Sequence, residues 1–105
     1  MSYPTLPSNI CKRKTITDIT GEKQYFAVLD EVTQVQSTAP DKVIYLQQLQ
    51  FEDGHIELRL AYYIIGKKPK MAGKWVWGQY ATMIPPKDFQ AIISKASEKG
   101  WFRKQ

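Results

Sequence analysis

The sequence predicts a single α+β domain, in which an antiparallel hairpin and one further strand form a sheet that a C-terminal helix covers on one face. Three observations predict this class: two β-rich runs flank an Asp-Gly pair, a third run has strand composition, and a final segment places apolar side chains at helical spacing. A chain of 105 residues with 43% hydrophobic residues is large enough for one packed core. We expect a flexible basic tail at residues 1–20 and one domain at residues 21–105.

The expected tail begins with Pro4 and Pro7, which interrupt regular structure, and contains the basic cluster Cys11-Lys12-Arg13-Lys14. This cluster could contact phosphates or simply keep the tail solvated, and we favour the second interpretation. From Glu22 the pattern changes, because apolar residues recur at intervals of three and four, as on one face of a helix. A strand is the alternative there, since tyrosine, phenylalanine and valine prefer strands. The apolar residues concerned are Tyr25, Val28, Leu29, Val32 and Val35.

The hairpin is predicted from residues 43–51 and 55–65, which Glu52-Asp53-Gly54 joins. Side chains alternate along a strand, so the second run has two faces. We expect the more apolar one to face the core: Ile56, Leu58, Leu60, Tyr62 and Ile64. In the first run the apolar phase switches near Gln47-Gln48, which either a β-bulge or a strand covered on both faces would explain.

The third strand is expected at residues 75–84 and ends at Pro85-Pro86. Pro86 suits the first position of a helix, where its missing N–H has no helical partner. We expect that helix near residues 86–98, followed by Gly100 as a C-terminal stop. Its apolar face consists of Phe89, Ile92, Ile93 and Ala96.

The functional signal lies in residues 58–87, which hold six basic and five aromatic side chains and no carboxylate. Single-stranded nucleic acid offers phosphates and exposed base faces, and such side chains bind both. The alternatives are a cationic loop beside core tryptophans, and a dimer interface rich in aromatic residues. The candidate nucleic-acid-binding residues are Arg59, Tyr63, Lys67, Lys68, Lys70, Lys74, Trp75 and Trp77.

Residues 43–97 resemble the positive cofactor four family of transcriptional coactivators. Two stretches carry the resemblance: Ile56-Glu57-Leu58-Arg59, and Met83-Ile84-Pro85-Pro86-Lys87-Asp88-Phe89. The resemblance implies a single-stranded DNA-binding homodimer with little sequence specificity, a transcription-related accessory factor. It also implies that Arg59 contacts phosphate on an open sheet face and that Phe89 anchors the helix. Residues 1–20 do not match the lysine- and serine-rich segment that precedes the domain in that family.

A metal-dependent nuclease and a protein-binding subunit are the other function classes to which the sequence points. Asp41, Glu52, Asp53 and Glu57 are candidate metal ligands of a nuclease, but Arg59 stands where such a site needs a titratable lysine. We therefore expect no enzyme. A regulatory or adaptor subunit that binds other proteins through its aromatic surface is the alternative function.

The compartment and cofactors follow from residue counts. One cysteine, Cys11, and one histidine, His55, predict neither an internal disulfide nor a zinc site, and we expect no cofactor. No apolar run approaches the length of a membrane span, and the N-terminus lacks the order of a signal peptide. We expect a cytoplasmic protein with single-stranded nucleic acid and a second copy of itself as partners.

Overall fold

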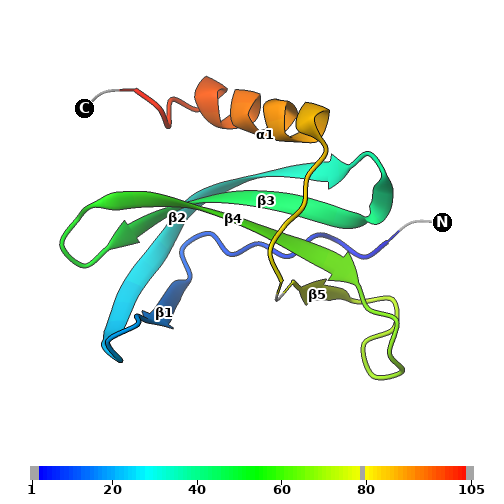
Figure 1. Ribbon diagram of the computed structural model, residues 1–105, viewed down its shortest axis with the longest axis horizontal. Helices are drawn as coiled ribbons and strands as arrows, with labels where there is room; N and C mark the ends of the chain where they lie inside the picture. Colours follow the sequence, from blue (N-terminus) through cyan, green and yellow to red (C-terminus); the bar gives the residue numbers. More distant parts are fainter. Residues whose placement is uncertain (1–2, 79, 104–105) are drawn as a thin grey trace.

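The computed structural model describes residues 3–78 and 80–103 of the chain. It consists of a five-stranded antiparallel meander, in the order β1-β2-β3-β4-β5, and one C-terminal helix (Figure 1). The predicted α+β class is confirmed at this level. The elements are β1 (Arg13–Thr17), β2 (Lys23–Gln36), β3 (Ala39–Phe51), β4 (Ile56–Ile65), β5 (Trp75–Trp77) and α1 (Pro86–Glu98).

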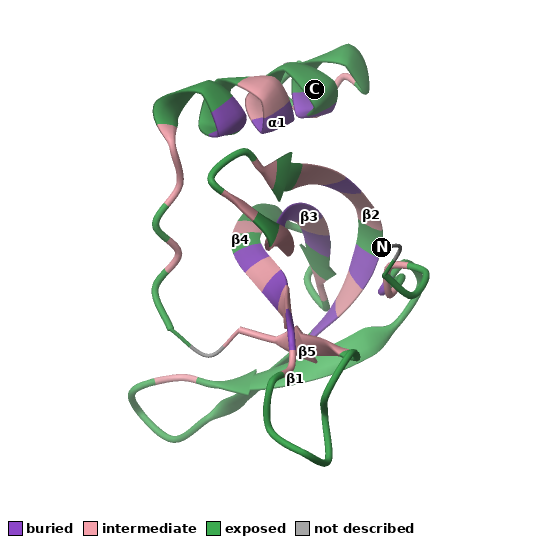
Figure 2. Ribbon diagram, turned by 90° about the vertical axis from the view of Figure 1, so that its right-hand side faces the viewer, coloured by how far each residue is buried: buried purple, intermediate pink, exposed green. Residues whose placement is uncertain are grey.

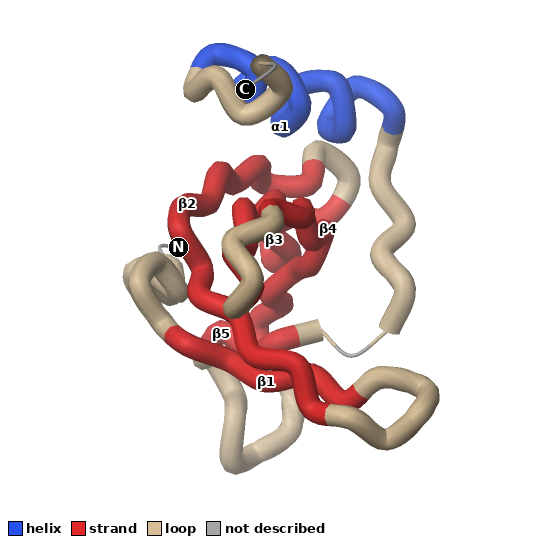
Figure 3. The backbone as a smooth tube through the Cα atoms, turned by 90° about the vertical axis from the view of Figure 1, so that its left-hand side faces the viewer, coloured by secondary structure: helices blue, strands red, loops and turns tan. Residues whose placement is uncertain are grey.

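The sheet is strongly curled, so that its two edge strands, β1 and β5, approach each other (Figures 2 and 3). We call the face inside the curl the inner face; it carries Val43, Tyr45 and Tyr63, and Leu6 of the N-terminal segment packs on it. The outer face carries Ile44 and Leu46, and α1 lies over it. Both faces of β3 are therefore covered, which explains the phase switch in its sequence.

The helix was predicted correctly, from Pro86 to Glu98. Ile92 and Ala96 are fully buried against the outer face of the sheet. The first turn is tied down by Asp88, whose carboxylate accepts hydrogen bonds from the backbone N–H and the hydroxyl of Ser37, at 2.8 and 3.0 Å. Phe89 is 47% exposed, so the expectation that it anchors the helix is wrong.

The predicted hairpin is also confirmed, since β3 ends at Phe51 and β4 begins at Ile56. Gly54 has φ = 90°, a value that glycine adopts without the steric cost that other residues incur. Register is unbroken along the pair, from Gln50 opposite Ile56 to Lys42 opposite Ile64.

Residues 23–36 form strand β2, so the predicted helix is wrong and the strand alternative holds. The reason is a β-bulge in β2 between Val28 and Asp30. Val28 lies opposite Leu49, whereas beyond the bulge Val32 lies opposite Leu46, which belongs to the other face. A strand that changes face in this way spaces its apolar residues by three and four, as a helix does.

The expected core face of β4 is wrong for the first half of the strand, although Tyr62 of that face packs on the core beneath α1. Ile56, Leu58 and Leu60 are 37–40% exposed on the outer face. The opposite face supplies the buried residues Ala61 and Tyr63. The physical reason is that the inner face is closed by the curl and the N-terminal segment, whereas α1 packs on β2 and β3 and leaves this part of β4 uncovered.

The third predicted strand is shorter than expected, since β5 comprises only Trp75–Trp77. Gly78 then packs so closely on the ring of Tyr62 that a Cβ there would lie 2.1 Å from it. Residues 80–85 carry the chain past the sheet to α1 (Figure 3). Gln79, which was expected within the strand, lies outside the described residues.

The N-terminal segment differs from the expected solvated tail. Residues 13–17 pair with β2, with Thr15 opposite Tyr25. Before them, the Pro7 carbonyl accepts a hydrogen bond from the Tyr45 hydroxyl at 2.7 Å. No helix within the described part of the chain combines the length and apolar character that crossing a bilayer requires.

Candidate nucleic-acid interface

Arg59 is the central cation of the inner face. Its guanidinium lies 5.0 Å from the ring centroid of Phe26 and 5.1 Å from that of Trp77, a cation–π arrangement on both sides. Its Nε and Nη2 both donate to the side-chain oxygen of Gln47, at 2.9 and 2.8 Å. Burial lowers the pKa of Arg59, an effect that the nearby Tyr63 and Glu31 oppose. Arg59 is thus a half-buried, oriented cation.

A polar network extends from Arg59 across the inner face. The amide of Gln47 donates to Glu31 at 2.9 Å, and the backbone N–H of Asn9 donates to the same carboxylate at 2.9 Å. The side-chain amide of Asn9 donates in turn to the Tyr63 hydroxyl at 3.2 Å. Gln47 and Asn9 are buried, so these hydrogen bonds satisfy polar groups that would otherwise be costly to bury. The network fixes both Arg59 and the N-terminal segment.

The predicted aromatic residues share the inner face with Arg59. Trp77 lies opposite Tyr63 in the ladder, and their rings meet edge to face at 5.2 Å. Trp75 also packs on this cluster, and its indole N–H donates to the Pro4 carbonyl at 2.9 Å. Both tryptophans are half-buried, whereas Tyr63 is buried. Only the tryptophans therefore keep ring surface for a ligand.

Three predicted site residues, Arg59, Tyr63 and Trp77, line one cleft of about 200 Å³. Its other side is formed by β1, because the curl brings the two edges of the sheet together. The sequence analysis assigned those β1 residues to a tail, although the three consecutive β-branched residues Thr15, Ile16 and Thr17 were a signal for a strand. Asn9 and Thr15 were missed, and Lys14 was named only within the basic cluster that could contact phosphates.

The predicted lysines do not enter this cleft. They lie on the loop between β4 and β5, which projects from the body of the molecule (Figure 1). All four are exposed, and the only ion pair described for them joins Lys67 to Asp41 at 3.7 Å. The loop closes through the hydrogen bond from the Gly66 N–H to the Lys74 carbonyl, at 2.8 Å. The loop leads directly into Trp75, the first residue of β5, and Trp77 of the same strand lines the cleft. Loop and cleft are therefore neighbours. The loop lysines are Lys67, Lys68, Lys70 and Lys74.

Charge is separated along β4, because the carboxylates gather at the β3–β4 turn, at the opposite end of the strand from the lysine loop (Figure 1). There His55 contacts the carboxylates of Asp53 and Glu57, in the second case at 2.7 Å. The hydrogen bond with Glu57, followed by that with Asp53, raises the pKa of His55. This end of the molecule is therefore less favourable to a polyanion than the loop end, which holds four lysines.

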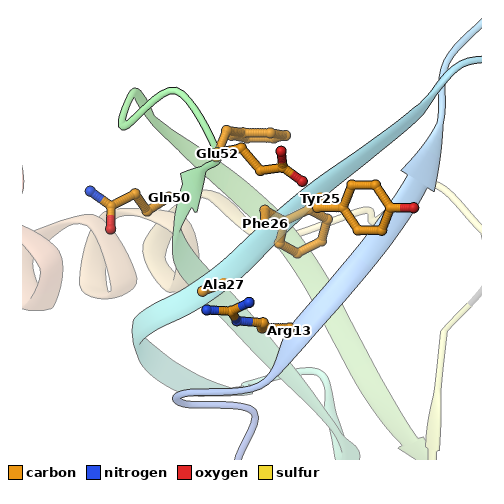
Figure 4. Close-up of a pocket in the computed structure, with 7 residues that line it drawn as sticks. Arg13, Tyr25, Phe26, Ala27, Gln50 and Glu52 are labelled. Atoms are coloured by element: carbon orange, nitrogen blue, oxygen red, sulfur yellow. The ribbon is translucent and has the colours of Figure 1, made fainter.

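A second cleft, of about 440 Å³, lies between β2 and the end of β3 (Figure 4). Tyr25 and Phe26 of β2 line it with Arg13 of β1 and Glu52. This second cleft carries charges of both signs. It is therefore less favourable for a polyanion than the cleft beside Arg59. Within the described residues, no group of three or more histidine, cysteine, aspartate or glutamate side chains is placed to hold a metal ion.

No protein-family model, curated protein or solved structure matches the chain.

Proposed function

We propose that this protein binds single-stranded nucleic acid, with DNA the expected form, with little sequence specificity and as an accessory factor in transcription. The observation that carries the proposal is the meeting of Arg59, Lys14 and Trp77 in one cleft beside the lysine loop. Two cations and a half-exposed indole at one place offer a phosphate site and a stacking surface together. The proposed path of the strand runs from this cleft, past Trp75, to the loop.

The size of the cleft favours a polymer over a small molecule. Pockets that enclose a drug-sized ligand measure roughly 300–1,000 Å³, and this cleft is about 200 Å³. It therefore suits one phosphate or the edge of one base, while the rest of the strand lies on the surface. A duplex would keep its base faces stacked away from Trp77, so an unpaired strand is the better ligand.

The loop lysines supply the sequence-independent part of binding. Each phosphate contact releases counterions, and the log–log salt slope of affinity changes by roughly 0.7 per contact with a single strand. Four exposed lysines without a carboxylate inside the loop are suited to this role. Phosphate contacts carry no sequence information, so binding through the loop lysines is expected to show little sequence specificity.

The test compares two double variants with equal charge change. Lys68→Ala/Lys70→Ala removes two loop cations, and Lys23→Ala/Lys87→Ala removes two exposed cations elsewhere. Anisotropy titration of a labelled single-stranded oligonucleotide at several salt concentrations should show a slope that is shallower by roughly 1.4 for the loop variant. The control should stay near wild type. Equal slopes in both variants, or no binding by the wild-type protein, would overturn the proposal.

The alternative, a regulatory or adaptor subunit that binds proteins, is favoured by a different observation. Ile56, Leu58 and Leu60 are exposed together on the outer face of β4. Neighbouring exposed apolar side chains of this kind mark protein contact sites.

A further inference from the structure

Most of β4 is an open sheet edge. β5 pairs only with residues 63–65, and one more hydrogen bond joins the Gly78 N–H to the Tyr62 carbonyl at 2.8 Å. From Ile56 to Ala61, β4 has β3 on one side and no strand on the other within the described residues. Open edges of this kind template pairing with another chain.

The backbone direction at this edge follows from Tyr62. Its carbonyl points toward β5, and in an antiparallel sheet successive residues direct their polar groups to alternate sides. The N–H and C=O groups of Ile56, Leu58 and Leu60 therefore face the open side. The side chains of these three residues are the exposed apolar group of the outer face. One stretch thus offers backbone hydrogen bonds and apolar surface together.

We propose that two copies of this chain pair through this edge, antiparallel, across a two-fold axis at Leu58. In this register Leu58 lies opposite Leu58 of the second copy, and Ile56 lies opposite Leu60. The pairing uses residues 56–60, which fits within the open stretch and leaves the β4–β5 pairs intact. The inference shares Arg59 with the proposed function, but its test measures self-association without nucleic acid, so the two proposals can fail separately.

The charges on the inner face select this register. Only residues 56, 58 and 60 direct their N–H and C=O groups to the open side, so these residues of one copy must lie opposite the same set of residues in the other copy. The two-fold axis can then pass through residue 57, 58 or 59, near the middle of the open stretch. An axis at residue 57 places Glu57 opposite Glu57, and one at residue 59 places Arg59 opposite Arg59. Like charges in directly opposed positions are unfavourable. Only the axis at Leu58 places Glu57 opposite Arg59, and it does so twice.

Both charged residues can make that contact. Glu57 is exposed, with 60% of its side chain accessible to solvent; its Oε2 contacts His55, and no hydrogen bond is described for its Oε1. Arg59 uses Nε and Nη2 for Gln47, and a guanidinium has five N–H donors, so donors remain for a carboxylate. The partner that fits this edge best is therefore a second copy, whose charges complement it by symmetry.

The first test is sedimentation velocity of the full chain over a concentration series. Wild type should be dimeric, and Glu57→Lys should weaken self-association about tenfold or more, since the new lysine would face Arg59. Glu52→Lys makes the same charge change in the exposed turn, outside the paired stretch, and should match wild type. A monomeric wild type at ~100 µM, or a Glu57→Lys variant that associates like wild type, would overturn the proposal.

The register has its own test in a Cys11→Ser background, because Cys11 is exposed. Leu58→Cys should form a disulfide-linked dimer on mild oxidation, since opposed hydrogen-bonded residues have Cα atoms about 5.5 Å apart, within the disulfide range. Leu60→Cys faces Ile56 of the second copy and should stay uncrosslinked. Equal crosslinking of the two variants would contradict the axis at Leu58.

Discussion

The replacement Gln47→Leu tests the polar network that holds Arg59 in place. Gln47 is fully buried, accepts from two Arg59 nitrogens and donates to Glu31. A hydrogen bond to a charged group contributes about 1.5–3 kcal/mol to stability. Arg59 and Glu31 are only half-buried and can bind water once Gln47 is replaced, so the loss for each of these two partners lies at the lower end of this range. The two losses together amount to about 3 kcal/mol. The added apolar burial offsets about 1 kcal/mol, so we expect a net loss of about 2 kcal/mol.

The assay is urea unfolding, followed by tryptophan fluorescence, with Gln48→Leu as the matched control. Gln48 is the half-buried neighbour on the outer face, and no side-chain hydrogen bond is described for it. The control should lose less than ~0.5 kcal/mol, as substitutions away from such networks usually do. If Gln47→Leu and Gln48→Leu lose the same free energy of unfolding, the network does not stabilise the fold. The fixed orientation of Arg59 must then have another cause.

Three further predictions concern the helix, the turn and the aromatic surface. Asp88→Ala removes both hydrogen bonds to Ser37 and should cost about 2 kcal/mol in thermal unfolding; a loss below ~0.5 kcal/mol would show that the contact is idle. Since the folded pKa of His55 is raised above 6.5, its stabilising contribution is complete below pH 6.5 and is lost as the pH rises through the folded pKa. NMR titration should show that Glu57→Gln lowers this pKa, and an unchanged value would contradict the contact. Trp77→Ala should weaken single-strand binding by about 1–3 kcal/mol without changing the salt slope; a folded variant with wild-type affinity would exclude stacking there.

Local signals predicted the hairpin turn and the C-terminal helix well. Pro86 and Gly100 bound the helix, and Gly54 sits in the turn, because each acts through its own backbone preference. Such preferences operate whatever the rest of the chain does. The helix and the hairpin therefore follow from neighbouring residues alone.

The N-terminal half depends on contacts that local patterns do not encode. The bulge after Val28 gives a strand the apolar spacing of a helix. Pro4 and Pro7, which suggested a tail, lie on the inner face because Trp75 and Tyr45 donate hydrogen bonds to their carbonyls. These partners are 71 and 38 residues away along the chain.

The candidate site divides in the same way. Alternation along β4 placed Arg59 and Tyr63 on one face, and the ladder adds Trp77 to them. The arrival of Lys14 beside them depends on the curl of the sheet, which alternation does not determine. The sequence could therefore predict which residues share a face and could not predict what closes over it.

The measurement that tests the central claim most directly is a tryptophan fluorescence titration with a single-stranded oligonucleotide and its duplex, each at two salt concentrations. Our account predicts quenching by the single strand, weaker binding of the duplex, and affinity that falls steeply with salt. Equal binding of both forms, or single-strand affinity that does not respond to salt, would contradict it.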